Sequence, residues 1–187
     1  MGKHFVVENV VATANLGQLV NLDEISQRFP WWTAEYSPEK FPGLVFRLKK
    51  PKTASLIFST GKIVCTGARS EEDARKAVRT VVRTLRRELG LKLPSKFEVK
   101  IQNIVASGRF GRDIDIAKLA TTLPKTMYEP EQFPGAIHRM QEPKVVFLIF
   151  SERGSFVCTG AKRMEDVKKA VDALEKKIEE LKLFREE

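Results

Sequence analysis

The sequence is poor in the residues that build cofactor sites and cross-linked scaffolds. It has only two cysteines and two histidines in 187 residues, too few for a disulfide framework or a zinc cluster. No apolar run approaches the roughly 20 residues of a membrane-spanning helix, and residues 1–17 lack the basic, apolar and cleavage segments of a signal peptide. No glycine-rich phosphate loop and no recurring acid–base pair is present. We therefore expect no membrane segment, no cofactor and no enzymatic activity.

Acidic residues are scarce relative to basic ones. The chain carries 33 Lys and Arg against 24 Asp and Glu, a formal net charge of +9. Such an excess favours an anionic partner without identifying it as nucleic acid. The excess is uneven, with 16 basic against 9 acidic residues (+7) in residues 1–94 and 17 against 15 (+2) in residues 95–187. A partner that responds to charge therefore meets two unequal ends.

What the chain does contain is an internal duplication. Residues 36–59 align with residues 128–151 without a gap and are identical at 13 of 24 positions. The motif VCTGA then recurs at 64–68 and 157–161, after one extra residue in the second copy. The distance in sequence between the two copies exceeds the roughly 20–50 residues of a solenoid repeat. We therefore predict two repeats, residues 1–94 and 95–187, that share one continuous sheet. Cys65 and Cys158 fall inside the duplicated motif and are expected to be small buried residues.

Both repeats predict the same order of elements: a strand, a short amphipathic helix, four short strands and a long helix. Spacing of apolar residues and β-branched runs place these elements. The predicted first strands are Phe5–Ala14 and Phe97–Ser107, the short helices Leu22–Phe29 and Ile114–Leu123, and the long helices Ser70–Leu89 and Met164–Leu183. Asn21 and Ser70 are candidate helix caps, and Gly90 ends the first long helix before a linker, Leu91–Ser95.

Alternation along the strands assigns side chains to the two faces of the sheet. If the long helices cover the face that carries Ile57, Cys65, Ile149 and Cys158, the other face stays uncovered. That face would be wide, mostly apolar and almost free of charge, and it would carry Asn9, Val11, Leu56, Phe58, Val64, Thr66, Asn103, Val105, Leu148, Phe150, Val157 and Thr159. Such a patch predicts a partner.

The surrounding residues indicate which partner. Cations flank the strand ends at Lys40, Arg47, Lys49, Lys50, Lys52, Lys62, Arg139, Lys144 and Arg153. An apolar floor ringed by cations suits the minor groove of DNA, where Asn and Thr can tell A·T from G·C but little more. The four phenylalanines Phe41, Phe58, Phe133 and Phe150 are either wedges that unstack bases or ordinary core residues. Asn9 and Asn103 are either base contacts or residues of a bulge or a sheet edge. Their recurrence in both repeats favours the DNA-contacting interpretation.

Other interpretations stay open at this point. An RNA-binding sheet would also display aromatic rings, which stack on single-stranded bases, and a helix-grip-like ligand-binding protein is the other alternative. The basic residues of the first long helix form either a solvated face or a site for a protein partner or upstream DNA; they are Arg75, Lys76, Arg79, Arg83, Arg86 and Arg87.

The motifs ENVVATANLG, YSPEKFPG and PKTASLIFSTGKIVCTGA, with their second copies, resemble the TATA-box-binding protein family in its compact archaeal form, from about Phe5 to Leu183. The resemblance implies an α+β saddle, a ten-stranded antiparallel sheet with four helices on its convex side. It further implies a general transcription initiation factor that binds the TATA box through the minor groove, kinks it and recruits transcription factor B and RNA polymerase. Kinking by apolar wedges is a property of that family and is not deduced from these residues. The implied location is the archaeal cytoplasm, on the chromosome, or the nucleus of a eukaryote.

Carried over residue by residue, the resemblance assigns four sets of contacts. Base contacts fall on Asn9, Val11, Val64, Thr66, Asn103, Val105, Val157 and Thr159. The wedges and the residues packed near them are Phe41, Phe58, Phe133, Phe150, Leu56, Leu148 and Pro134. Phosphate contacts fall on Arg47, Lys52, Arg139 and Lys144, with Lys40 and Lys62 as further candidates. Glu129, Glu131 and Gln132 lie where the family meets transcription factor B. Whether chains dimerise through the uncovered face when DNA is absent is left open.

Overall fold

The fold is α+β, as predicted. The structure is a computed structural model that describes residues 5–93 and 96–186, and within those residues it contains ten strands and four α-helices. The first repeat comprises β1 (Phe5–Asn15), α1 (Leu22–Arg28), β2 (Ala34–Glu35), β3 (Leu44–Lys49), β4 (Lys52–Ile57), β5 (Lys62–Ala68) and α2 (Glu71–Leu89). The second comprises β6 (Lys100–Arg109), α3 (Ile116–Thr122), β7 (Thr126–Met127), β8 (Ala136–Met140), β9 (Val145–Ile149), the 3-10 turn η1 (Glu152–Gly154), β10 (Ser155–Ala161) and α4 (Met164–Glu180).

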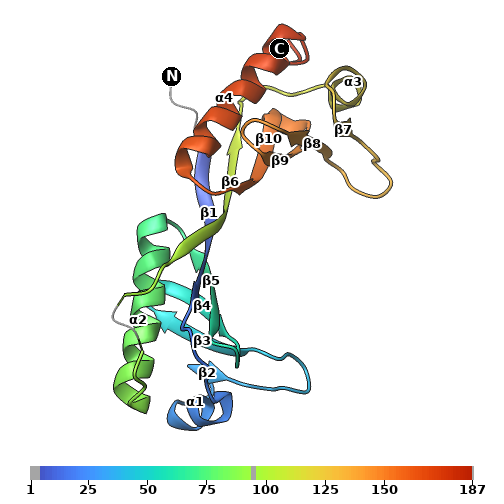
Figure 1. Cartoon of the computed structure of the whole chain (residues 1–187). Helices are drawn as coiled ribbons and strands as arrows, with labels where there is room; N and C mark the ends of the chain where they lie inside the picture. Colours follow the sequence, from blue (N-terminus) through green and yellow to red (C-terminus); the bar gives the residue numbers. More distant parts are fainter. Residues whose placement is uncertain (1–4, 94–95, 187) are drawn as a thin grey trace. The chain divides into compact units, whose positions relative to one another are not determined.

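The strands form one antiparallel sheet in the order β2-β3-β4-β5-β1-β6-β10-β9-β8-β7. The chain divides into two compact units: Asn9–Gln102, here called the N-unit, and Met1–Glu8 with Asn103–Glu187, here called the C-unit. Figure 1 shows the elements of each unit. The duplication boundary predicted at residues 94 and 95 stays a prediction, and Pro94 and Ser95 of the predicted linker lie outside the described residues.

Side-chain caps fix where the helices begin. The Asn21 carboxamide oxygen accepts a hydrogen bond from the Glu24 backbone N–H at 3.1 Å, and Ser70 Oγ accepts one from the Asp73 N–H at 3.0 Å. Each oxygen satisfies an N–H group that has no partner inside the helix. Gly90 ends α2 with a φ of 65°, a left-handed conformation that glycine adopts without a steric penalty. The predicted caps are therefore confirmed.

The long helices cover the predicted face of the sheet. Helix α2 packs on β4 and β5, and α4 packs on β10. Ile57, Cys65, Ile149 and Cys158 are fully buried there. Burial raises the pKa of the Cys158 thiol to about 12 and also raises the pKa of Cys65, because a thiolate is poorly solvated in an apolar core. Both cysteines are therefore protonated packing residues, as expected.

Several element boundaries differ from the predicted ones, and three of the differences lie beside specific contacts. Strand β6 starts at Lys100 and not at Phe97, and just before it the Val99 carbonyl accepts a hydrogen bond from Arg75 Nη1 at 2.7 Å. Helix α3 starts at Ile116 because Asp115 caps it, which leaves Ile114 to pair with Phe184 of the C-terminal segment. Helix α4 ends at Glu180, and the Leu183 N–H turns back to the Ile178 carbonyl at 3.0 Å.

Candidate nucleic-acid interface

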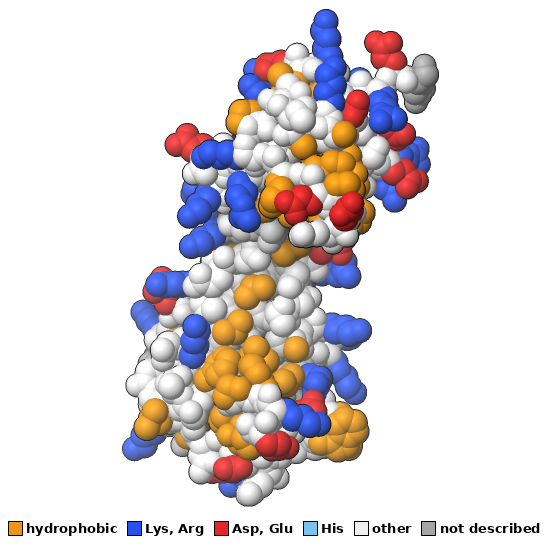
Figure 2. All heavy atoms as spheres, turned by 90° about the vertical axis from the view of Figure 1, so that its right-hand side faces the viewer, with side chains coloured by type: hydrophobic (Ala, Val, Ile, Leu, Met, Phe, Trp, Pro, Cys, Tyr) orange, Lys and Arg blue, Asp and Glu red, His pale blue; other side chains and the backbone are white. Residues whose placement is uncertain are grey.

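The sheet face opposite the long helices, here called the open face, carries rows of apolar side chains in each unit. In the N-unit, Val45 pairs with Leu56, Leu56 with Val64, and Val64 with Thr13 across four strands. In the C-unit the equivalent row is Ile137, Leu148, Val157 and Ser107. All eight side chains are partly exposed. Figure 2 shows hydrophobic side chains gathered on this face, with Lys and Arg at its margins.

A hydrogen-bonded cluster around an asparagine recurs in both units. The Asn9 carboxamide oxygen accepts from the Gly67 N–H at 2.7 Å, and its amide Nδ2 lies 2.9 Å from Thr66 Oγ1. Asn103 makes the same contacts, at 2.7 Å to the Gly160 N–H and 3.2 Å to Thr159 Oγ1. The backbone N–H fixes which end of each carboxamide is the oxygen, so the NH₂ group has a defined position as a donor.

The asparagine clusters coincide with β-bulges. Register shifts by one residue between β1 and β5 at Thr66-Gly67 and between β6 and β10 at Thr159-Gly160. Gly67 and Gly160 have φ values of 100° and 101°, a region that L-residues rarely adopt. Asn9 and Asn103 are not bulge residues themselves, but they lie beside the bulges and accept hydrogen bonds from the bulge glycines. These bonds hold their amide groups on the open face, where they stay candidates for base contact.

The four predicted wedge residues form two ring pairs. Phe41 and Phe58 have ring centroids 6.0 Å apart, and Phe133 and Phe150 have centroids 5.8 Å apart, both edge to face. Phe58, Phe133 and Phe150 are partly exposed and Phe41 is exposed. None of the four is a buried core side chain, so their rings are available to a ligand.

A glycine in each FPG motif makes room for its ring pair. A Cβ on Gly43 would lie 2.8 Å from a ring carbon of Phe41 and 3.1 Å from one of Phe58. At Gly135 it would lie 2.9 Å from Phe150 and 3.0 Å from Phe133. Real Cβ atoms do not approach other atoms so closely, so both motifs require glycine to seat the rings.

Equivalent tight turns precede Phe41 and Phe133. The Phe41 N–H donates to the Ser37 carbonyl at 3.0 Å, and the Phe133 N–H donates to the Glu129 carbonyl at 2.9 Å. In the second turn Glu129, Glu131 and Gln132 are all exposed, as is Pro134 beside them. The turn therefore presents two carboxylates to solvent next to a wedge pair.

The predicted phosphate-contacting side chains are all exposed, but two equivalent arginines differ in their surroundings. Arg47 Nη2 forms an ion pair with Glu35 Oε2 at 2.9 Å. Arg139 occupies the equivalent position in the C-unit, where Met127 replaces the glutamate, and its side chain forms no ion pair within the described residues. Arg47 must therefore leave a surface ion pair to bind a phosphate, whereas Arg139 is not so held.

Lys52 and Lys144 lie beside the asparagine clusters. A Cβ on Gly67 would lie 3.4 Å from the Lys52 carbonyl oxygen, and one on Gly160 would lie 3.7 Å from that of Lys144. In the C-unit, Arg139, Lys144, Thr159 and Lys162 line one hollow of about 330 Å³. The backbone of both lysines thus passes beside the asparagine clusters, and in the C-unit three cations share a hollow with Thr159. Lys40 and Lys62, the two further candidates, are also exposed.

The structure also places polar residues on the interface that the sequence analysis did not single out. Thr13 Oγ1 accepts from Gln102 Nε2 at 2.9 Å in the N-unit, and Ser107 Oγ donates to Glu8 Oε1 at 2.7 Å in the C-unit. Gln102 and Glu8 are equivalent by the duplication, so one repeat carries an amide where the other carries a carboxylate. Their position one residue before each asparagine was the signal that could have identified them.

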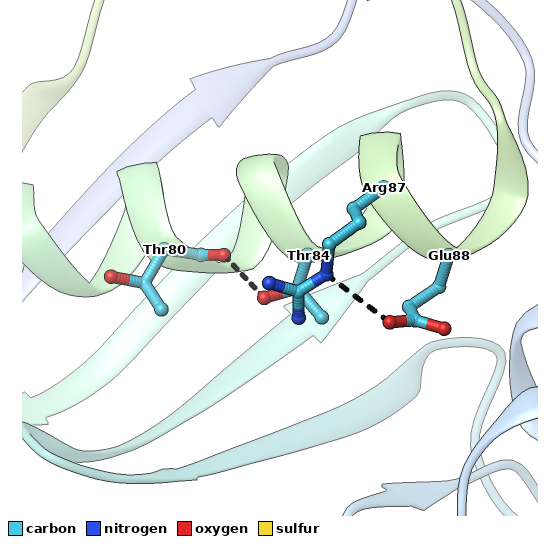
Figure 3. Close-up of polar contacts among 4 residues, drawn as sticks. All are labelled: Thr80, Thr84, Arg87 and Glu88. Carbon is cyan, nitrogen blue, oxygen red and sulfur yellow. Dashed lines mark hydrogen bonds and ion pairs between the residues drawn. The ribbon is translucent and has the colours of Figure 1, made fainter.

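The basic face of α2 is partly used by the fold. Arg75 and Arg86 donate to the carbonyls of Val99 and Leu93, and Arg87 pairs with Glu88 at 3.2 Å. Figure 3 shows this pair beside Thr84, whose hydroxyl donates to the Thr80 carbonyl at 2.8 Å. Lys76, Arg79 and Arg83 are the remaining cations of this helix. A site for a protein partner or upstream DNA on this helix stays a prediction.

Within residues 5–93 and 96–186, no group of three or more His, Cys, Asp or Glu side chains is placed to hold a metal ion. No helix of that part of the chain is long and apolar enough to cross a membrane.

A family model described as transcription factor TFIID, or TATA-binding protein (TBP), matches residues 4–88 and 98–181. The chain belongs to the TATA-binding protein family. The matched ranges contain both asparagine clusters and both phenylalanine pairs. The family is one of transcription factors, which agrees with the expectation that this chain is not an enzyme.

Individual members of the TATA-binding protein family are similar over nearly the full length. The TATA-box-binding protein of Pyrobaculum calidifontis is 49% identical over 180 residues, covering 96% of this chain and 88% of that protein. The one from Methanothermobacter thermautotrophicus is 45% identical over 178 residues, covering 95% and 96%. The solved structure of the Methanococcus jannaschii TBP matches with a TM-score of 0.83 at 41% identity and covers 95% of this chain and 99% of that one. The α+β fold and the archaeal type of the resemblance are thereby confirmed.

Proposed function

We propose that this chain is a general transcription initiation factor that binds the TATA element of double-stranded DNA through the minor groove. The observation that carries the proposal is the asparagine cluster, which recurs with the same hydrogen bonds at Asn9 and Asn103. Each cluster holds an amide donor and a threonine hydroxyl beside apolar rows. The minor groove of A·T pairs offers acceptors to such donors, while the guanine amino group of G·C pairs would collide with the apolar rows.

The base-contacting set is Asn9, Val11, Val64, Thr66, Asn103, Val105, Val157 and Thr159. Its valines and asparagines are partly exposed on the open face, which supports their contact with base edges. Around them, six exposed cations would neutralise phosphates. Arg47 and Arg139 lie within β3 and β8, whereas Lys40, Lys52, Lys62 and Lys144 lie at strand ends or in turns.

The wedge role rests on the two ring pairs. Phe41 with Phe58 and Phe133 with Phe150 stand at accessible edges of their units, with Leu56, Leu148 and Pro134 nearby. Apolar side chains inserted between base steps unstack them and bend DNA by about 20–90°. We expect each pair to produce one kink in the bound DNA.

The decisive experiment is a bend assay by energy transfer between dyes at the ends of a TATA duplex. A G·C-rich duplex and the separated single strands serve as controls at the same salt concentration. We expect binding and bending of the TATA duplex alone. Equal binding of all duplexes, or preference for single strands, would contradict minor-groove recognition and favour an RNA-binding or single-strand-binding sheet.

Recruitment of transcription factor B, and through it RNA polymerase, is the second part of the proposal. Glu129, Glu131 and Gln132 are exposed in the turn before Phe133, whereas the equivalent turn of the N-unit has Ser37, Glu39 and Lys40. This difference between the repeats gives a basic factor one preferred turn and so fixes the orientation of the complex.

Reversing both charges, Glu129→Lys with Glu131→Lys, should abolish the ternary complex while DNA binding is kept or slightly strengthened by the added positive charge. Gel shifts with and without the factor measure both effects. An undiminished ternary band would place the docking surface elsewhere.

Because the apolar open face is uncovered without DNA, we further propose that DNA-free chains pair through it. Sedimentation at increasing concentration, with and without a TATA duplex, tests this.

A further inference from the structure

A hollow of about 310 Å³ lies on the helix-covered side of the C-unit, away from the open face. It is bounded by Leu123 and Pro124 after α3, by His138 and Met140 on β8, and by Ala173, Leu174 and Lys177 on α4. Its walls are mostly apolar. The volume is at the lower end of the roughly 300–1,000 Å³ range of ligand pockets.

The N-unit fills the equivalent space with two aromatic rings. Phe46 is 1% exposed, and its ring centroid lies 5.1 Å from that of Phe29, at an interplanar angle of 85°. Phe29 is the C-cap of α1 and Leu123 is the C-cap of α3, so the two are equivalent. His138 is equivalent to Phe46 by the duplication. The C-unit therefore has a leucine and an imidazole where the N-unit has two phenylalanines.

A cross-strand exchange explains why the C-unit core is intact although this ring is missing. Phe46 pairs with Ser55 across β3 and β4, whereas His138 pairs with Phe147 across β8 and β9. Each pair has one phenylalanine, but on opposite strands. Phe147 is fully buried and packs against Phe156 at 5.9 Å. The ring has thus moved one strand inward, and the hollow remains at the outer position.

The lining can satisfy a polar atom as well as an apolar ring. His138 Nδ1 lies 2.9 Å from Thr126 Oγ1, and burial lowers the pKa of His138. A neutral imidazole has one donor and one acceptor nitrogen. The lining also includes Gln141, whose carboxamide oxygen can accept a hydrogen bond. A partner side chain with an aromatic body and one N–H or O–H group therefore fits the chemistry of the walls.

The rim of the hollow selects for negative charge. Lys125, Arg139 and Lys177 line it against one carboxylate, Glu142, and all four are exposed. A basic partner would meet three cations, whereas an acidic one would be attracted to them.

We infer that this hollow is a second protein-docking site, which binds an acidic segment of a partner protein that inserts one aromatic side chain between α3, β8 and α4. The shape argument is the ring pair Phe29–Phe46, which shows what the same framework accommodates. The charge argument is the cationic rim. Because His138 faces the helices and its neighbour Ile137 lies on the open face, the hollow stays accessible when DNA covers the open face. Lys125 and Lys177 remain as rim cations when Arg139 contacts a phosphate.

The test uses the full chain and a short synthetic peptide of Asp, Glu and Ser residues with one central fluorotryptophan. Fluorine NMR then observes only the peptide, although the protein has two tryptophans of its own. We expect a saturable shift of the signal, and no competition from the same peptide with alanine in place of the aromatic residue.

Two variants probe the site in different ways. Leu123→Phe with His138→Phe fills the hollow as in the N-unit and should weaken peptide binding at least about tenfold, the scale on which a buried aromatic anchor contributes. Lys177→Glu reverses one rim charge without touching the core and should weaken binding severalfold. Lys168→Glu is the matched control, because it lies about 2.5 turns from Lys177 on the opposite side of α4, and it should bind the peptide normally.

Thermal unfolding and TATA-duplex binding are measured for every variant, so that loss of the fold is distinguished from loss of the site. If the filled variant does not fold, Lys177→Glu against Lys168→Glu decides. Absence of any peptide shift, or equal binding by the wild type and Lys177→Glu, would overturn the inference. Self-association that disappears both in the filled variant and in Trp31→Ala with Trp32→Ala would identify a second copy as the occupant and would also overturn it.

Discussion

Replacing Asn103 by Asp and by Ala separates its two proposed roles, which are the hydrogen bond to the β-bulge at Gly160 and the contact with a base. In the wild type, the Asn103 oxygen accepts from the Gly160 N–H at 2.7 Å and Nδ2 lies 3.2 Å from Thr159 Oγ1. Aspartate keeps an oxygen for Gly160 and can also accept the Thr159 proton. It removes only the amide donor that points to the DNA side. Alanine removes both.

The two variants should therefore differ in stability. The Gly160 bond is a neutral backbone-to-side-chain hydrogen bond, which contributes about 0.5–1.5 kcal/mol net to the free energy of unfolding. We expect Asn103→Ala to lose that amount and Asn103→Asp to lose little. Chemical denaturation measures the difference.

Selectivity for DNA should fall in both variants. A good base contact contributes about 1–3 kcal/mol of discrimination, which corresponds to roughly 5- to 150-fold in the ratio of TATA to G·C-rich affinity. The ratio is the proper readout, because the aspartate charge also weakens all duplexes. If alanine lowers stability while both variants keep the wild-type ratio of TATA to G·C-rich affinity, Asn103 only stabilises the bulge. Asn9→Asp and Asn9→Ala provide the matched test in the N-unit.

Three further outcomes are expected. Phe150→Ala should weaken the bent complex but leave the unfolding midpoint nearly unchanged, since this ring is partly exposed; early unfolding with normal bending would mean that Phe150 is core. Lys144→Ala should weaken all duplexes alike and reduce the slope of log affinity against log salt by about 0.9, as loss of one phosphate contact requires; an unaltered slope would contradict that contact. Stability should fall as pH drops below 6.5, because the lowered pKa of His138 lets the unfolded state bind a proton more readily; the fall is at most about 1.4 kcal/mol per pH unit, and a His138→Phe variant with the same pH profile would refute this origin.

Much of the fold could be predicted from the sequence because the duplication supplied each pattern twice. A single Val-rich run such as that of β1 is ambiguous, but its recurrence 94 residues later with Asn103 at the place of Asn9 removes most of the ambiguity. The open face followed from strand alternation around Ile57 and Cys65. That prediction requires only that side chains alternate between the two faces of a strand and that a helix covers one face.

The predictions failed where contacts between distant residues decide the outcome. Strand β6 begins later than predicted, next to the Val99 carbonyl, which accepts a hydrogen bond from Arg75 of α2. No local sequence pattern indicates that contact. The bulge glycines and the Asn–Gly hydrogen bonds likewise depend on register between strands 57 residues apart in sequence. The ion pair of Arg47 with Glu35 needed the pairing of β2 with β3, which two-residue strands hardly signal.

Differences between the repeats were also hard to interpret from sequence. Trp31 and Trp32 have no counterpart between Pro124 and Lys125, and they are 72% and 58% exposed. Apolar content alone suggests burial for such residues. Only comparison of the α1–β2 connection with the α3–β7 connection shows that they belong to an insertion outside the shared core.

The single phenylalanine in each cross-strand pair limits the order in which such repeats can diverge. Exchanging Phe46–Ser55 for the arrangement of His138–Phe147 takes two substitutions, and the intermediate has either two rings or none. Loss of a buried ring costs about 3–5 kcal/mol, whereas overpacking costs about 1–3 kcal/mol. Against a typical total stability of about 5–15 kcal/mol, the overcrowded intermediate is the more accessible one. The two positions are therefore epistatic, and the cost of transplanting a residue from one repeat to the other depends on its cross-strand neighbour.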